Sequence, residues 1–354
     1  MTNTINTGEA EYKEKCVLAR KQHVNFFQRF LHLSPSSLGV YDCSRLTLAF
    51  FSLSGLDLLH ALDTIPDEEQ KHIIDWIYSL QILPSETVHS SRCGFQGSQT
   101  HRIKYDHSFE TGHLAMTYTG LASLIILGDD LSRINKNAIL DGMRALQQKD
   151  GSFCGTKNEE SDMRFVYCAA CISYMLNDFS GIDLPRMVDF ITSSINYDGG
   201  IGQGPQLESH GGSTFCGIAA LYLCGLLEKS LSNSKIEKLK RWCISRQESG
   251  FQGRPNKSVD TCYSFWIGGT LKLLNSLHLV DFVENKNYIM STQDQLIGGF
   301  SKWPNTVGDP LHTYLGLCGL SLMNEFELSP IEPALNISTR AHQHLRNLHS
   351  MWGS

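Results

Sequence analysis

The chain has 354 residues, of which 41% are hydrophobic and 19% are charged. This composition is typical of a soluble globular protein with a large core, and the length fits one domain or two. The formal net charge of −6 argues against broad binding to nucleic acid or to an anionic membrane, because both require a positive field. Any cluster of basic residues is therefore expected to act locally.

Cysteine usage and the chain ends indicate a cytoplasmic protein. The eleven cysteines are odd in number, and most lie in apolar runs such as FVYCAACISYML, as reduced buried thiols do. The longest apolar run, residues 113–128, is interrupted by threonine and serine and is too short for stable membrane insertion. We predict a polar N-terminal extension over residues 1–20 without a secretory signal, a single domain over residues 21–348 and a tail over residues 349–354.

A glycine motif followed by an apolar residue recurs along the chain, at CGFQG, DGSFCG, DGGIGQG, SGFQG and GGFSK. Its apolar members, called the marker residues here, are spaced 58, 48, 50 and 49 residues apart: Phe95, Phe153, Ile201, Phe251 and Phe300. An apolar segment rich in small residues follows each marker, and an amphipathic segment precedes most of them. Each period of about fifty residues therefore predicts one nearly all-apolar helix and one half-polar helix.

In chain order, the apolar helices are predicted within residues 46–62, 113–127, 163–176, 213–227, 262–274 and 312–323. A two-helix unit cannot bury its apolar helix alone, but a stack of such units can. An open array would expose apolar faces at both ends, and the sequence has no obvious polar caps. We therefore predict a closed ring of about six helical hairpins, with an open array as the alternative.

The repeat also aligns a set of polar residues. Counting eleven or twelve residues from a marker leads to Arg164, Ser213, Cys262 and His312, each at the start of an apolar helix. If the repeats are equivalent, these side chains face one rim of the central cavity. Helix N-termini present free N–H groups and the positive end of the helix dipole, so this rim favours anions.

Three residues near this rim could hold zinc. Asp260, Cys262 and His312 offer a carboxylate oxygen, a thiolate and an imidazole, and catalytic zinc often has three protein ligands with a fourth position open. The spacing by itself is a weak signal, because a cysteine at a helix start is more often part of the core. The offset of His312 by one repeat makes the two interpretations about equal.

Basic residues lie immediately upstream. Arg254 and Lys257 are three residues apart in the predicted loop GRPNKSVD and would suit a phosphate group. Considered alone, this loop is more often simply solvated. His210 opens the preceding apolar helix and could join them, although a lone loop histidine is usually a surface residue. The chain has no G-x-x-x-x-G-K-[ST] phosphate loop, no G-x-S-x-G elbow and no D-D-x-x-D magnesium motif.

The repeats, with the strings FCGIAAL, GRPNKSVDTCYSFW and DPLHTYLGLCGLSLM, resemble the β subunits of protein prenyltransferases from about residue 23 to residue 348. SRLTLAFFSLSGLD, DMRFVYCA and GGFSKWP are most similar to the geranylgeranyltransferase type I branch. The resemblance implies an all-α fold, an α/α toroid that works only as a heterodimer with a helical-repeat α subunit. It implies zinc held by Asp260, Cys262 and His312. It also places the lipid diphosphate near His210, Arg254, Lys257 and Tyr263.

Three further positions take their roles from this resemblance. Thr47 stands where farnesyltransferases carry a tryptophan, so a small residue here leaves room for a twenty-carbon chain. Lys302 stands where the farnesyl enzyme has an aspartate linked to magnesium, so Mg²⁺ is predicted not to be required; a solvated surface lysine is the alternative. Arg164 matches a position that orders the C-terminal end of the protein substrate.

The resemblance thus predicts a catalytic β subunit that transfers geranylgeranyl from geranylgeranyl diphosphate to the cysteine of a C-terminal C-a-a-X motif, with X mainly Leu. Acceptors would be proteins such as Rho/Rac-type small GTPases and G-protein γ subunits. The residues expected to carry the chemistry are Asp260, Cys262, His312, Tyr263 and Lys302. The alternatives are a farnesyltransferase β subunit, a Rab geranylgeranyltransferase β subunit, or a non-catalytic toroid that binds isoprenoids or partner proteins.

Overall fold

The structure is a computed structural model that describes residues 17–32, 42–101 and 110–353. Most of the extension predicted for residues 1–20 lies outside this range. The helices are α2 (Arg20–His32), α3 (Arg45–Leu58), α4 (Asp67–Ser79), α5 (Leu114–Ile126), α6 (Lys136–Arg144), α7 (Met163–Met175), α8 (Leu184–Ser193), α9 (Gly211–Leu223), α10 (Leu227–Ser230), α11 (Asn233–Ile244), α12 (Tyr263–Leu273), α13 (Phe282–Ser291), α14 (Pro310–Leu322) and α15 (Thr339–Trp352).

Short antiparallel strand pairs connect some of these helices. They are β1 (Gln81–Ile82) with β2 (Gly94–Phe95), β3 (Phe153–Cys154) with β4 (Ser161–Asp162), and β5 (Ile331–Glu332) with β6 (Ile337–Ser338). Each pair is only two residues long on each side, so the fold is all-α, as predicted.

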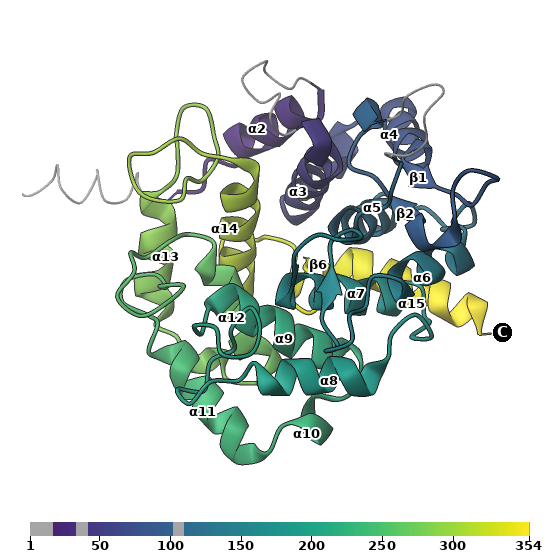
Figure 1. Ribbon diagram of the computed structural model, residues 1–354. Helices are drawn as coiled ribbons and strands as arrows, with labels where there is room; N and C mark the ends of the chain where they lie inside the picture. The colour runs from purple at the N-terminus through teal and green to yellow at the C-terminus, as the bar shows by residue number, and fades with distance from the viewer. Residues whose placement is uncertain (1–16, 33–41, 102–109, 354) are drawn as a thin grey trace, which may run out of the picture.

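Within the described residues, the apolar helices form a closed ring (Figure 1). Neighbours pack in the order α3, α5, α7, α9, α12, α14, and α14 packs back against α3. These are called the inner helices here. Closure gives every inner helix an apolar neighbour on both sides, which removes the exposed ends that an open array would leave. The predicted ring is confirmed, and the open-array alternative is wrong.

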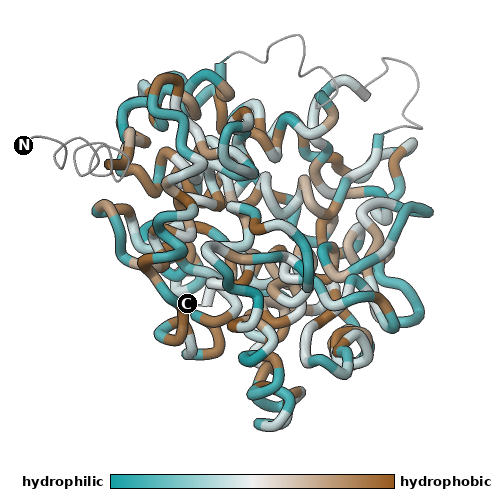
Figure 2. Tube along the Cα trace, turned by 90° about the vertical axis from the view of Figure 1, so that its left-hand side faces the viewer, coloured by the Kyte–Doolittle hydropathy of each residue, from teal (hydrophilic) through white to brown (hydrophobic). Residues whose placement is uncertain are grey.

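The contrast between inner and outer helices follows from their composition. The inner helix α9 is buried along nearly its whole surface, leaving only Gly212 and Tyr222 out of the core. The outer helix α11 buries Leu239, Trp242 and Cys243, which share one face at helical spacing. Each fully buried large apolar side chain contributes about 1.5–3 kcal/mol. Figure 2 shows hydrophilic residues along many of the peripheral loops, where chain segments face solvent.

Small residues in the inner helices allow close packing. Gly55 of α3 lies directly under the ring of Phe27 of α2, and a Cβ atom added at Gly55 would come within 2.2 Å of that ring. A side chain at this position would therefore force the first hairpin apart. The abundance of small residues in the apolar segments is thus a packing requirement of the ring.

The marker residues anchor the loops between outer and inner helices. All of them are fully buried. Each pairs backbone to backbone with a residue just after the preceding outer helix, as Gln293 does with Phe300. In addition, the N–H of Phe300 donates to the hydroxyl of Thr313, and the N–H of Ile201 donates to that of Thr214. This repeated connection holds each loop over the start of its inner helix, which explains the near-constant spacing.

The C-terminal segment crosses the ring at the end opposite the marker loops. In Figure 1 this yellow segment, with β6 and α15, lies behind the inner helices, and it contacts α3, α5 and α14. Helix α15 continues to Trp352, so residues 349–352, expected as a tail, are its last turn. In the part of the chain that the structure describes, no helix combines the length and the apolarity needed to span a membrane.

Candidate active site

The starts of the inner helices gather at one rim of the ring, and polar side chains cap them. Asp162, His210 and Asp309 are the N-cap residues of α7, α9 and α14, and each side chain accepts a backbone N–H of its own helix. Such caps satisfy N–H groups that the helix cannot pair internally. Arg164, Ser213 and His312 lie in the first turns of α7, α9 and α14, and Cys262 is the N-cap residue of α12, so all four are at the starts of inner helices.

Asp260, Cys262 and His312 come together at this rim. One ligand-type atom from each residue lies within 4.8 Å of the others. The Nε2 atom of His312 is 3.3 Å from Oδ1 of Asp260, and both side chains are largely buried. Asp260 also accepts the N–H of Cys262 through Oδ1 at 3.0 Å. The trio spans two repeats, so the ring brings together ligands that are 50 residues apart in the sequence.

Asp309, which the sequence did not indicate as a site residue, orients the imidazole of His312 through the ring nitrogen that faces away from Asp260. Asp309 Oδ2 lies 2.6 Å from Nδ1 of His312, which leaves Nε2 facing Asp260. A carboxylate on the second ring nitrogen is the usual support of a metal-ligating histidine. The signal in the sequence is the acidic residue three positions before His312.

The surroundings of the trio shift the pKa values of its members in ways that follow from burial and from their contacts with one another. Burial raises the pKa of the Cys262 thiol well above its usual range, and the Asp260 carboxylate adds to the shift. For His312, burial lowers the pKa, but hydrogen bonds to Asp260 and Asp309 outweigh it and raise the pKa to about 9. A metal ion would replace these protons and offset the negative charges of Asp260 and Cys262. Zinc accepts this oxygen, sulfur and nitrogen donor set.

His210 and Tyr263 form a pair on the neighbouring stretch of the rim. Nε2 of His210 is 3.0 Å from the hydroxyl of Tyr263, and Nδ1 accepts the N–H of Gly212. Burial and the nearby Arg254 cation lower the pKa of His210, so the ring is neutral near pH 7 and its proton is on Nε2. His210 therefore donates to the oxygen of Tyr263, and the Tyr263 proton is free to donate to another acceptor.

The two cations of the GRPNKSVD loop are placed differently. Arg254 lies near the His210 and Tyr263 pair, where its charge influences the pKa of both, and it forms an ion pair with Glu208 at 2.9 Å. Lys257 is exposed on the same loop. The structure brings Arg254 to the rim. The backbone N–H of Lys257 donates to the carbonyl of Arg254 at 3.3 Å, but among the described residues its ammonium group forms no ion pair with the other predicted residues.

Lys302 reaches the trio from the next loop. Its Nζ atom is 3.7 Å from Oδ2 of Asp260 and 4.4 Å from the centre of the Trp303 ring. The hydroxyl of Tyr288 donates to the carbonyls of Val259 and Lys302, at 2.8 and 3.3 Å, and so ties the two loops together. The ammonium group of Lys302 therefore lies beside the trio while its side chain is 45% exposed, so its role at the site stays a prediction beside the alternative of a solvated surface lysine.

Behind the rim, the ring encloses a cavity of about 350 Å³ with an aromatic wall. The wall includes Phe50, Phe51, Tyr118, Tyr167 and Trp266. Thr47, Arg164, His210 and Ser213 also line this cavity. Arg164 is held by Asp162 and Glu160, at 2.6 and 2.8 Å. An elongated apolar ligand with an anionic head fits this combination of an aromatic interior and a basic rim.

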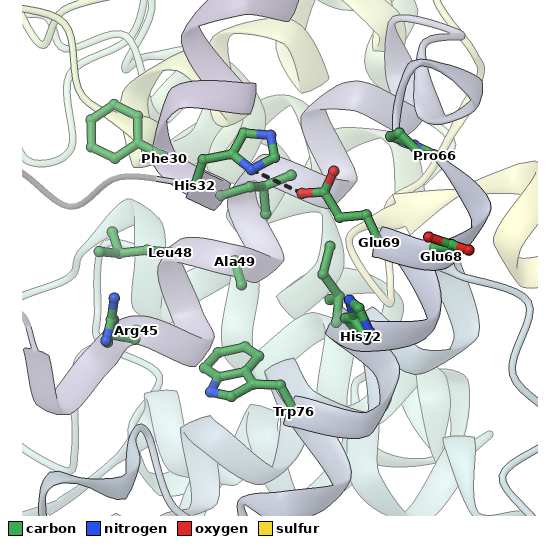
Figure 3. A pocket seen from close by; sticks show the side chains of 12 residues that line it. Phe30, His32, Arg45, Leu48, Ala49, Pro66, Glu68, Glu69, His72 and Trp76 are labelled. Carbon is green, nitrogen blue, oxygen red and sulfur yellow. Dashed lines mark ion pairs between the residues drawn. The ribbon is translucent and has the colours of Figure 1, made fainter.

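A second groove lies outside the ring between α2, α3 and α4 (Figure 3). Apolar side chains such as Phe30, Leu48 and Trp76 line it, and an ion pair between His32 and Glu69 at 2.8 Å borders it. It contains none of the residues predicted for the site. The groove is therefore separate from the rim chemistry, although it is larger than the central cavity.

This ring of helical hairpins, with its polar rim and aromatic interior, defines a known class. Residues 18–337 match the family model of the prenyltransferase alpha-alpha toroid domain, and the chain therefore belongs to the prenyltransferase family. The fold predicted from the sequence, an α/α toroid, is confirmed.

Individual relatives narrow the group. The chain is 40% identical to the geranylgeranyl transferase type-1 subunit β of Dictyostelium discoideum, covering 89% of this chain and 94% of the relative. It is also 40% identical to the Arabidopsis thaliana type-1 subunit β, covering 90% and 88%. Protein geranylgeranyltransferase-I of Candida albicans, solved in complex with GGPP, superposes with a TM-score of 0.85 at 30% identity, covering 94% of this chain and 99% of that chain.

The type-1 branch and the enzyme class predicted from the sequence are thereby confirmed. Type-2 and farnesyltransferase β subunits are also similar to this chain, at lower identity. The farnesyl and Rab alternatives are accordingly weaker, and a non-catalytic toroid does not fit a chain that groups with transferase subunits.

Proposed function

We propose that the chain is the zinc-dependent catalytic β subunit that transfers geranylgeranyl from its diphosphate to the cysteine of a C-terminal C-a-a-X motif, in a heterodimer with a prenyltransferase α subunit. The observation that carries this proposal is the Asp260, Cys262 and His312 trio at the mouth of an aromatic cavity. The free cysteines of the described residues agree with a reducing, cytoplasmic environment.

In this proposal, Asp260, Cys262 and His312 hold the zinc ion. When bound, zinc supplies a cation that lowers the pKa of an acceptor thiol at the open fourth position. Asp309 keeps the His312 ring in the orientation that binding needs. Lys302 places a second positive charge beside Asp260.

The remaining rim residues bind the lipid diphosphate and stabilise it as it leaves. As the carbon–oxygen bond to C1 of the lipid breaks, negative charge accumulates on the diphosphate, and the acceptor sulfur forms the new bond to C1. Tyr263 has a free proton to donate, Arg254 and Lys302 supply charge, and His210 holds Tyr263 in place. Donors of this kind act in the transition state, and losing one costs on the order of 10²–10³ in rate. The exposed ammonium group of Lys257 adds to the positive charge of the same loop.

The decisive test is a transfer assay on the chain co-expressed with a candidate α subunit. The acceptor is a Leu-ended C-a-a-X peptide, offered the C20 and C15 diphosphates separately, with and without a zinc chelator. Zinc-dependent transfer that prefers C20 is the expected result, because Thr47 leaves space in the cavity wall. Preference for C15 would retain the chemistry but contradict the role of Thr47. Absence of transfer by a zinc-loaded heterodimer would contradict the acceptor class.

Replacing Asp309 with asparagine is expected to weaken zinc binding by about 10–100-fold, because the His312 ring loses its charged support. Asparagine is also a good N-cap residue, so α14 should remain intact. The affinity is measured by competition with a metal-binding dye. Asp281→Asn is the matched control, since Asp281 caps the outer helix α13 away from the site. Equal zinc affinity in both variants would show that Asp309 has no supporting role.

Replacing Lys302 with aspartate is expected to make turnover respond to added magnesium. The variant exchanges a built-in positive charge for a carboxylate that can hold Mg²⁺ near the diphosphate. Wild-type turnover should be insensitive to millimolar MgCl₂, whereas the variant should be slow without it and faster with it. Lys229→Asp, at an exposed position on α10, is the control. A variant that stays insensitive to magnesium would contradict the proposed part of Lys302.

A further inference from the structure

The deep end of the central cavity is closed by a turn that does not belong to the ring. Residues 333–336 connect β5 to β6 in the C-terminal segment, and Ala334, Leu335 and Asn336 are all buried. Asn336 lines the cavity, whereas the other lining residues come from the inner helices and the loop before α9. The floor of the cavity is thus contributed by a separate part of the chain.

Side chains of the inner helices hold this turn in place. The hydroxyl of Tyr118, on α5, donates to the carbonyl of Leu335 at 2.8 Å. That of Tyr314, on α14, donates to the carbonyl of Asn336 at 2.7 Å. The Cys318 thiol donates to Oδ1 of Asn336 at 3.5 Å. Both tyrosines are buried, so moving the turn would leave their hydroxyls unpaired at a cost that a ligand would have to supply. The floor is therefore rigid.

We propose that Asn336 limits the length of the isoprenoid chain that the cavity accepts. The inference rests on the proposed function, since it takes the ligand to be a prenyl diphosphate with its head at the rim. A chain that extends beyond the floor would press its hydrocarbon end against a fixed carboxamide. Because the turn does not yield, the additional methylene groups of a longer chain would clash with it, so the longer chain is rejected. Thr47 lies in the first turn of α3 and Asn336 in the turn between β5 and β6, so the two residues line the cavity from different elements.

Asn336→Gly tests this role without straining the backbone. Asn336 has a φ of 53°, a left-handed conformation that glycine adopts freely, and both main-chain acceptors of the turn are retained. The variant should free space only where the side chain was. The readout is the affinity of the heterodimer for C15, C20 and C25 prenyl diphosphates, measured without an acceptor peptide. The affinity for C25 relative to C20 is expected to rise about tenfold.

Two further variants make the result specific. Asn324→Gly is the matched control: Asn324 also has a positive φ, of 58°, but is exposed at the end of α14 and does not line the cavity. Its chain-length ratios should equal those of the wild type. Asn336→Asp keeps the side-chain shape and places a carboxylate at the floor, so it should weaken C20 binding more than C15 binding.

The possible failures are distinguishable. If the wild type binds C20 and both Asn336 variants keep its chain-length ratios, Asn336 does not limit the chain and only this inference is wrong. If the wild type binds no prenyl diphosphate, the inference falls together with the proposed function. Because binding is measured without turnover, a variant that folds but transfers slowly still decides the question.

Discussion

Replacing Cys262 with alanine is expected to abolish the proposed metal binding and transfer while leaving the chain able to pair with the proposed α subunit. Cys262 is buried at the start of α12. Its Sγ atom lies within 4.8 Å of a carboxylate oxygen of Asp260 and a ring nitrogen of His312. Its removal leaves one carboxylate and one imidazole, too few to retain zinc at the affinity of a three-ligand site. Zinc content should fall from about one per heterodimer to a trace, and turnover by at least about 10²–10³-fold.

The measurements are metal analysis of the purified heterodimer and a single-turnover assay. Cys243→Ala is the matched control. Cys243 is also a buried thiol, but it lies on the outer helix α11 and does not belong to the Asp260, Cys262 and His312 trio. The control should keep its zinc and its turnover. Full metal content and normal turnover in Cys262→Ala would show that the ligand assignment is wrong.

Replacing Arg340 with leucine is expected to destabilise the fold by about 3 kcal/mol, the largest effect on stability that we predict for a single contact. Asp57 of α3 is a buried carboxylate, and its Oδ1 accepts from Nε of Arg340 at 2.8 Å while its Oδ2 accepts from the Ser338 hydroxyl at 2.5 Å. A second Arg340 nitrogen donates to the carbonyl of Ile126 at 2.6 Å. The variant leaves the Asp57 charge without its partner. Arg340 is half-exposed, so the lower end of the usual cost for a broken buried pair applies.

The effect is measured as the midpoint of thermal unfolding, which should fall by roughly 4 °C for a chain of this size. Arg346→Leu, on the exposed side of the same helix, should leave the midpoint almost unchanged. Adding Asp57→Asn to Arg340→Leu should recover part of the loss, because it removes the unpaired charge. If the single variant unfolds at the wild-type temperature, the pair does not fasten the C-terminal segment to the ring.

The general plan of the fold was predictable because it depends on the hydrophobic pattern of short segments and on the length of the repeat. A period of about fifty residues, with one apolar and one amphipathic segment, predicts helical hairpins, and the lack of caps favours a closed ring. The same period aligned Cys262 with His312, and the structure places them side by side. Repeats of equal length put equivalent positions at equal heights, so one-dimensional spacing becomes three-dimensional proximity.

Contacts between segments outside the repeat period were not predictable. Asp309 lies only three residues before His312, yet its role depends on the direction in which the His312 ring points. Proximity along the chain predicts that Lys257 acts with Arg254, but in the structure Lys257 is exposed. The expected tail at residues 349–352 is helical because α15 packs against the ring, a contact that no local pattern encodes.

The sequence by itself therefore determined the helical repeat and the alignment of polar residues at the helix starts, because both depend on periodicity. Spacing left Asp260, Cys262 and His312 between a metal site and a core position, and their assignment as zinc ligands came from the family resemblance and stays a prediction. Only the tertiary structure decided how deep the cavity is and what closes it. The floor at Asn336 and the Asp57–Arg340 pair join residues from opposite ends of the chain. Such contacts form when the ring closes, and their geometry depends on how all the inner helices pack together.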